Sequence, residues 1–339
     1  MNRNMNPALV NLGIIKGITP KMRYAEGENF FAWQKRAKEK LAELLGIQKI
    51  KTPEGASFEI EYKKECEGFT EYRLIIESEE NYSFPAVLRV PEGISAPMPL
   101  IICLQGHSTG FHISLGKPKY EKDEALISSG DRDFCVQAVK EGFAALAIEQ
   151  RNFGECGGKE NGGINCHTSS MSAIINGRTT IGERVHDVSR AIDVMIESFD
   201  FIDTGRIMIM GNSGGGTASY YAAAMDERIA LCMPSCAVCT YKDSIAAMFH
   251  CTCNFIPNIA NYFDMGDLGG LIAPRKLIVV HGKHDDIFPE AGVYEAYDEI
   301  KRLYAAAKAE DKCRIVTGDG GHRFYAADSW PVLHKMMEK

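Results

Sequence analysis

The sequence lacks several features that mark particular classes of protein. No run of apolar residues approaches the roughly 18 that a membrane-spanning helix requires. No stretch is rich in lysine and arginine, and the 339 residues carry 38 basic against 45 acidic side chains, a net charge of −7 at pH 7. A protein that wraps nucleic acid needs a basic face. We therefore expect neither a membrane nor a nucleic acid as a partner.

The N-terminal segment has little positive charge, no continuous apolar stretch and no small-residue cleavage site, so it does not resemble a secretory signal. The eleven cysteines form an odd set with irregular spacing, and a chain of this size needs no disulfide scaffold. These observations favour reduced thiols and a cytoplasmic location.

Four of the cysteines fall within one short segment. Cys236 and Cys239 have C-x-x-C spacing, and Cys251 and Cys253, which follow His250, have C-x-C spacing. Zinc binding is one interpretation of this cluster. The other interpretation is that these cysteines are small buried side chains that pack in the core, as free cysteines commonly do. We expect no metal and no cofactor, and the zinc interpretation of the Cys236/Cys239/Cys251/Cys253 cluster stays open.

Residues 1–57 predict an N-terminal helical extension. Apolar side chains recur on one face of a helix over about 30–45, Asn29 can cap its start, and Gly46 follows its end. The apolar face can pack on the chain's own core or on a second subunit, so a homo-oligomer stays open.

Residues 58–339 predict an α/β domain. Alternating apolar residues first indicate antiparallel strands, at 58–62, 72–78 and 85–90. From residue 99, short apolar strands alternate with helices, which is typical of a mostly parallel, doubly wound sheet buried on both faces. One helix is expected over 181–199, with Thr180 and Glu183 as its capping box. Two long connections, about 152–180 and 237–273, are expected to be functional insertions.

Two segments match the pattern G-x-S-x-G. GNSGG at 211–215 lies between an apolar strand and a helix, the context in which a serine on a sharp turn becomes an exposed nucleophile. GHSTG at 106–110 also follows a strand, but no helix begins behind it. We therefore predict Ser213 as the nucleophile and interpret the segment containing Ser108 as a turn.

A serine nucleophile needs a base, and the base needs a carboxylate to orient it. In a doubly wound sheet such groups lie after the carboxyl ends of strands. Asp285 and Asp286 follow one predicted strand, and His322 follows the next, among glycines. The order serine, aspartate, histidine is that of the hydrolase fold. We predict His322 as the base. The competing histidines, which lack this context, are His107, His112, His250, His281 and His284.

These motifs resemble those of the α/β-hydrolase superfamily, and more narrowly its dienelactone-hydrolase-like and acetylxylan-esterase-like branch, from about residue 85 to the C-terminus. The family's acid loop commonly reads Gly-x-x-Asp-x-x-x-Pro, which maps onto Gly282, Asp285 and Pro289. The resemblance therefore favours Asp285 over Asp286 as the triad acid.

The same resemblance implies an oxyanion hole made by the backbone N–H groups of His107 and Gly214. The family's His-Gly-x turn appears here with Gln105 in place of histidine, which leaves the main-chain donor intact. The family's turn Arg-Gly-x-Gly-Glu corresponds to residues 151–155, where Asn152 replaces a glycine. GNSGG also departs from the G-x-S-Q-G of the cephalosporin and acetylxylan deacetylases.

The expected function is that of a serine carboxylic-ester hydrolase working through an acyl-enzyme on acetyl, short-acyl or aryl esters, those of carbohydrates included. The acidic charge balance disfavours polyanionic substrates. A thioester, lactone or small-peptide hydrolase on the same triad is the alternative, and a non-enzymatic binding protein is disfavoured because all three triad members are present. Four aromatic residues of the second insertion suggest a partly apolar acyl or aryl pocket: Phe249, Phe255, Tyr262 and Phe263.

Overall fold

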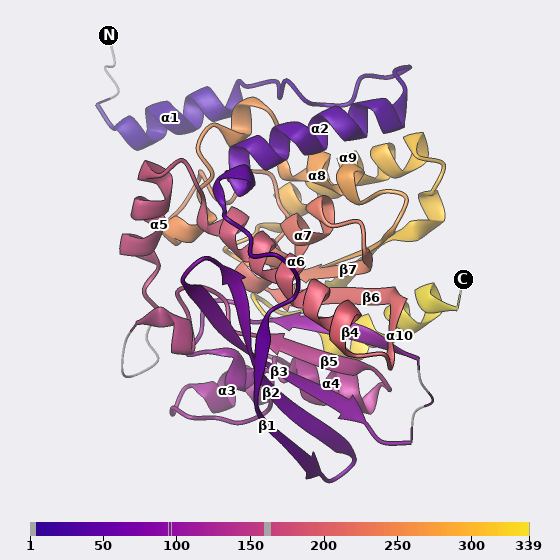
Figure 1. The fold of residues 1–339 in the computed structure, drawn as a ribbon. Coiled ribbons are helices and arrows are strands. Elements are labelled where there is room, and N and C mark those ends of the chain that lie inside the picture. The colour runs from indigo at the N-terminus through magenta and orange to yellow at the C-terminus, as the bar shows by residue number, and fades with distance from the viewer. Residues whose placement is uncertain (1–4, 94, 96, 159–163, 339) are drawn as a thin grey trace.

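The computed structural model describes residues 5–93, 95, 97–158 and 164–338. Its centre is a nine-stranded sheet with the order β1-β2-β3-β5-β4-β6-β7-β8-β9 (Figure 1). The strands are β1 (Phe58–Cys66), β2 (Phe69–Glu79), β3 (Tyr82–Pro91), β4 (Met98–Leu104), β5 (Ala144–Ile148), β6 (Ile202–Asn212), β7 (Ile229–Ser235), β8 (Lys276–Gly282) and β9 (Cys313–Gly318). The pairs β1–β2, β2–β3 and β3–β5 are antiparallel. The pairs from β5–β4 onward in the sheet order are parallel. The predicted fold class is confirmed.

Helices cover both faces of this sheet, as expected for short strands that are apolar throughout. The helices are α1 (Pro7–Lys16), α2 (Phe30–Leu45), α3 (Asp123–Ser128), α4 (Phe134–Lys140), α5 (Cys166–Ile175), α6 (Thr180–Ser198), α7 (Gly214–Met225), α8 (Met265–Ile272), α9 (Glu290–Ala306) and α10 (Ala326–Met337). Along β4, Leu100 and Ile102 belong to one core cluster, whereas Ile101 and Cys103 belong to the other. Successive strand residues point to opposite faces, so β4 is buried on both.

The predicted N-terminal helix is α2, and it packs on the chain's own core. The Asn29 side chain accepts a hydrogen bond from the N–H of Ala32, and Gly46 ends the helix at φ 72°. Trp33 is buried and donates from its indole N–H to the carbonyl of Met22 at 2.7 Å. Its ring lies against α8, where a Cβ on Gly270 would come within 2.7 Å of it. Figure 1 shows α2 lying over the helices of one sheet face.

Helix α6 occupies the expected position but begins at a different cap. The N-cap is Thr179, whose hydroxyl accepts from the N–H of Gly182 at 3.0 Å. Thr180 is already helical, so the predicted capping box of Thr180 and Glu183 is wrong. Glu183 instead pairs with Arg178 at 2.9 Å. Two adjacent threonines can each cap a helix, and here the extended backbone of Thr179 decides between them.

The two long connections have little regular structure. The first holds a short 3-10 turn (Gly154–Gly157) and α5, and residues 159–163 lie outside the described ranges. The second holds 3-10 turns at Thr252–Asn254 and Ile259–Asn261, followed by α8. Across the described ranges, each helix is too short or too polar to span a bilayer.

Candidate active site

Ser213 lies at a strained turn between β6 and α7. Its backbone has φ 58° and ψ −126°, a conformation that costs a side-chain-bearing residue free energy and persists only where the surroundings impose it. The Ser213 N–H donates to the carbonyl of Ser235 on β7 at 2.9 Å. Because α7 begins at the next residue, Ser213 lies at the positive end of a helix. This geometry is that of a nucleophile elbow.

Glycines allow the surrounding backbones to approach this turn. A Cβ on Gly106 would lie 2.6 Å from the carbonyl oxygen of Asn212 and 2.9 Å from the Cβ of Ser213. A Cβ on Gly215 would lie 2.2 Å from the carbonyl oxygen of Leu104. The chain leaving β4 therefore packs directly against the elbow, with no room for a side chain at either glycine.

Ser108, in the second G-x-S-x-G segment, has a different setting. A short 3-10 turn (Phe111–Ile113) follows it, and no α-helix begins there. Its hydroxyl is buried and has no hydrogen-bond partner among the described residues. The environment is that of a packed turn, as the sequence predicted.

The buried Asp285 and the half-buried His322 form a pair after β8 and β9. The Nδ1 of His322 lies 2.8 Å from Oδ2 of Asp285. Oδ1 of Asp285 accepts from the N–H groups of Ile287 and Phe288, at 2.9 and 3.1 Å. Burial acts to raise the pKa of Asp285, but the imidazole and the two N–H donors outweigh it and the pKa lies below its ordinary value. The carboxylate is therefore ionised and suited to orient an imidazole, whereas Asp286 is exposed.

Ser235 holds the elbow and the histidine loop together. Its carbonyl accepts from the N–H of Ser213, and its hydroxyl donates to the carbonyl of Arg323, the residue after His322, at 3.3 Å. The same hydroxyl bonds the side chain of Asn212 at 2.9 Å. Because β6, β8 and β9 are parallel, the three predicted triad residues follow strand ends at one edge of the sheet.

The predicted oxyanion donors lie side by side. A Cβ on Gly214 would come within 2.9 Å of the His107 ring and 3.9 Å of the His107 backbone nitrogen. Gly214 is the first residue of α7, where N–H groups have no partner within the helix. The N–H of Gly214 at the helix start and the N–H of His107 in the turn after β4 can together stabilise a developing negative charge.

The other histidines have other partners. His112 is buried and pairs with Asp123 at 2.8 Å. His281 lies 3.0 Å from the hydroxyl of Thr317, and His284 is exposed. Burial, together with the nearby rings of His107 and His322, lowers the pKa of His250 to about 4, so this ring is neutral at neutral pH.

Two further features belong to the turn at residues 151–155, which follows β5. Asn152, which replaces the family's glycine, has φ 76°, a conformation that asparagine tolerates better than most residues. Glu149, which no sequence pattern singled out, is fully buried beneath the same turn and accepts from the N–H groups of Phe111 and Glu155, at 3.1 and 3.2 Å. Burial raises its pKa to about 8.

The aromatic side chains of the second insertion lie in different environments. Phe263 is completely buried in the main core, and Phe249 is 94% exposed. Phe255 lines a cavity of about 380 Å³ between α1 and the insertion. Phe263 therefore cannot line the expected acyl or aryl pocket, and for the other aromatic side chains that pocket stays a prediction.

The four cysteines within residues 236–253 do not form the single cluster that the sequence suggested, because the C-x-x-C pair and the C-x-C pair lie in different places. Cys236 lies beside Asp285 and His322, and the Cys239 thiol lies 3.8 Å from the carbonyl of Pro289. Cys251 and Cys253 instead meet the side chains of His107 and Cys166. The C-x-C spacing joins only Cys251 and Cys253. His107 and Cys166 come from two other segments, so no sequence spacing indicated them as partners.

Comparisons with known proteins agree with the fold. The sequence model of the prolyl oligopeptidase family matches residues 176–335. A candidate hydrolase of Bacillus subtilis (strain 168), YtaP, is 27% identical over 252 residues, which cover 74% of this chain and 81% of that protein.

Solved structures also resemble the chain. A candidate acetyl xylan esterase from Bacteroides fragilis NCTC 9343 has a TM-score of 0.78 at 18% identity, over 93% of this chain and 83% of the other. A glucuronoyl esterase from Solibacter usitatus has a TM-score of 0.67 at 14% identity, over 94% and 96%. At these identities the likeness shows a shared fold. The sheet order, the elbow and these matches together place the chain in the α/β-hydrolase superfamily, as a hydrolase of the α/β-hydrolase type.

Proposed function

We propose that the protein is a serine hydrolase of carboxylic esters. The observation that carries this proposal is the strained turn at Ser213, which lies at the same sheet edge as the Asp285–His322 pair. A strained conformation at the start of a helix, with glycines packed around it, is the geometry a hydrolase nucleophile needs.

In the proposed reaction, His322 accepts the proton of Ser213 as Oγ bonds to the ester carbonyl carbon. Asp285 holds the imidazole by its Nδ1 and stabilises the imidazolium. The N–H groups of His107 and Gly214 stabilise the oxyanion. His322 then protonates the leaving alcohol. In the second half of the reaction, His322 accepts a proton from water as the water oxygen bonds to the acyl carbon, and it returns the proton to Oγ of Ser213 as the acyl-enzyme bond breaks. Each oxyanion donor contributes about 3 kcal/mol of transition-state stabilisation.

We propose acetyl, short-acyl or aryl esters as substrates, with esters of carbohydrates foremost. Two observations support this choice: structural neighbours named as acetyl xylan and glucuronoyl esterases, and a net charge of −7 that disfavours polyanionic substrates. Hydrolysis of p-nitrophenyl acetate, butyrate and octanoate and of acetylated xylooligosaccharides tests the proposal. Turnover of the acetyl esters that is lost in Ser213→Ala supports it, and failure on every ester contradicts it.

The match to the prolyl oligopeptidase family supports a second candidate, the hydrolysis of small peptides. The same triad serves both reactions, because bond choice is set by the pocket rather than by the nucleophile. Peptidyl p-nitroanilides in the same assay separate the two. A peptidase cleaves the anilides with a kcat/KM above that for simple acetyl esters, whereas the proposed esterase shows the opposite order.

A further inference from the structure

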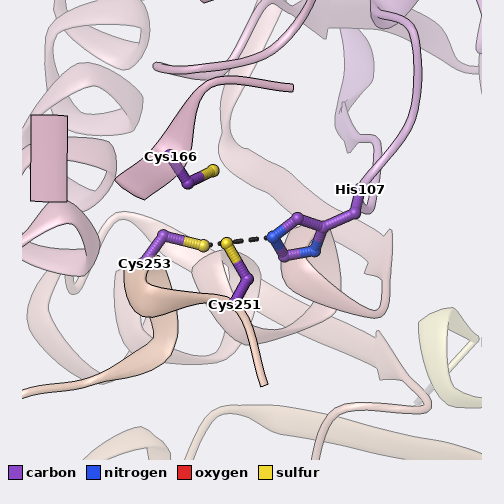
Figure 2. Close-up of side chains that lie close together, drawn as sticks. All are labelled: His107, Cys166, Cys251 and Cys253. Carbon is purple, nitrogen blue, oxygen red and sulfur yellow. Dashed lines mark hydrogen bonds between the residues drawn. The ribbon is translucent and has the colours of Figure 1, made fainter. Parts of the chain in front are cut away.

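Four potential metal ligands meet next to the elbow, outside the predicted triad. His107 comes from the turn after β4, and Cys166 begins α5 in the first insertion. In the second insertion, Cys251 precedes the 3-10 turn at Thr252–Asn254 and Cys253 lies within it. Figure 2 shows the three sulfur atoms and the imidazole converging from these separate segments. Their ligand atoms all lie within 4.8 Å of one another, and Nε2 of His107 lies 3.2 Å from Sγ of Cys253.

This donor set is one that zinc prefers. Three thiolates and one imidazole form a Cys₃His site, and with Zn–S bonds of about 2.3 Å the ligand atoms of a tetrahedral site lie about 3.5 to 3.8 Å apart. The observed upper limit of 4.8 Å is close to this spacing. Side-chain adjustments of about 1 Å therefore suffice to surround an ion.

Arg184 provides an independent observation that points to negative charge at this cluster. Its side chain is 1% exposed, and among the described residues no carboxylate lies within ion-pair distance of it. Its guanidinium has two neutral contacts, a 2.8 Å hydrogen bond from Nη2 to the carbonyl of Arg151 and the ring of Phe153 at 4.4 Å. It also faces sulfur: Nη1 lies 3.6 Å from Sγ of Cys253, and Nη2 lies 4.0 Å from Sγ of Cys166. A buried cation without a counter-charge is strongly unfavourable.

A zinc site supplies the missing charge. Three thiolates, a neutral imidazole and Zn²⁺ carry a net charge of −1, which balances the single positive charge of Arg184. N–H groups directed at the sulfur ligands are also the outer contacts that metal sites commonly have. Neutral thiols, or a disulfide between two of them, leave the guanidinium without a counter-charge.

We propose that His107, Cys166, Cys251 and Cys253 bind one zinc ion as a structural site. With four protein ligands the site is closed, so the ion has no open position for substrate or water. It ties the first insertion, the second insertion and the turn after β4 to one point. One consequence rests on the proposed function: the ion also fixes the backbone N–H of His107 in the oxyanion hole.

Metal content of the full chain tests the site without reference to activity. The protein is purified under reducing conditions without chelator, and zinc is measured by elemental mass spectrometry. We expect about one zinc ion per chain in the wild type, and a loss of most of it in Cys253→Ala and in Cys166→Ala. Cys239→Ala is the matched control: this buried cysteine belongs to the alternative C-x-x-C cluster, and its variant keeps the zinc.

Cobalt substitution provides a readout that does not depend on the variants folding. Exchange of zinc for Co²⁺ in the wild type is expected to give sulfur-to-cobalt charge-transfer bands and intense tetrahedral d–d bands. The proposal is overturned if the wild type holds no metal after anaerobic addition of zinc, if folded Cys253→Ala keeps as much zinc as the wild type, or if the cysteines are found in a disulfide. A lack of esterase activity alone leaves the metal result unaffected.

Discussion

His322 and Asp285 lie 2.8 Å apart, Nδ1 to Oδ2, and the Asp285 side chain is completely shielded from solvent. The adjacent Asp286 is exposed. Two neighbouring carboxylates therefore have different environments, and only one of them can orient the imidazole.

This pair predicts different effects for the two aspartates. Asp285→Asn removes the acceptor that fixes the His322 tautomer, and kcat on p-nitrophenyl acetate is expected to fall by about 10³- to 10⁴-fold. Asp286→Asn is expected to change kcat less than about twofold, since exposed substitutions away from a site have small effects. Equal losses in the two variants would assign the acid role to neither residue.

Gly106 makes a steric prediction about the elbow. In Gly106→Ala the new methyl group would lie 2.6 Å from the Asn212 carbonyl and 2.9 Å from the Ser213 Cβ, so one of the two segments has to move. We expect a loss of about 1 to 3 kcal/mol in the free energy of unfolding and a fall in kcat. Gly13→Ala, which has nothing within 4 Å, is the control: kcat is unchanged and the free energy of unfolding does not fall, since alanine favours a helix interior such as α1. Urea denaturation and initial rates measure the effects, and wild-type values for Gly106→Ala would refute the close packing.

Glu149 predicts a pH dependence of stability. Its pKa is raised from 4.5 to about 8 by burial, so between these values the folded protein holds a proton that the unfolded chain has released. Stability is therefore lost as the pH rises through this window, by at most about 1.4 kcal/mol per pH unit.

Replacing the ionisable group should remove that loss. Over two pH units within the window, the free energy of unfolding of Glu149→Gln is expected to fall by about 2 kcal/mol less than that of the wild type. Urea unfolding at about pH 5.5 and about pH 7.5, two values that lie inside this window, measures the difference in the free energy of unfolding. The exposed Glu65→Gln should keep the wild-type dependence. The same slope in Glu149→Gln and the wild type would show that Glu149 is ionised when buried.

Phe249 predicts a role in substrate binding. It is 94% exposed and precedes His250, whose ring lies 5.6 Å from Phe288, which in turn stacks on His322 at 5.9 Å. Phe249 therefore lies on the loop that packs beside the proposed base, and an exposed aromatic ring can contact an acyl or sugar group. Phe249→Ala is expected to raise KM several-fold with little change in kcat. The exposed Phe31→Ala, on α2, is the control. An unchanged KM for Phe249→Ala would place this residue outside the binding site.

The parallel part of the fold was predictable because its strands are buried on both faces. β4 and β8 are apolar along most of their length, and such short runs between helices are typical of strands in a parallel sheet. The position of Ser213 on a sharp turn was predictable because a strand, a glycine-flanked serine and a helix follow one another within a short segment. Its role as nucleophile stays a prediction.

Other features depend on contacts between distant segments. Cys166 and His107 meet Cys253 only because two insertions fold over the turn after β4, and the C-x-x-C spacing of Cys236 and Cys239 indicated the wrong partners. The buried position of Glu149 follows from close approach of Gly154, which no local pattern reveals.

Fluorophosphonate labelling identifies the nucleophile of the protein, because the reagent reacts with an activated serine. We predict that it labels the peptide that contains Ser213, that Ser108→Ala is labelled like the wild type, and that Ser213→Ala is not labelled and loses ester turnover by about 10⁴-fold or more. Labelling and turnover at wild-type levels in Ser213→Ala would contradict the account.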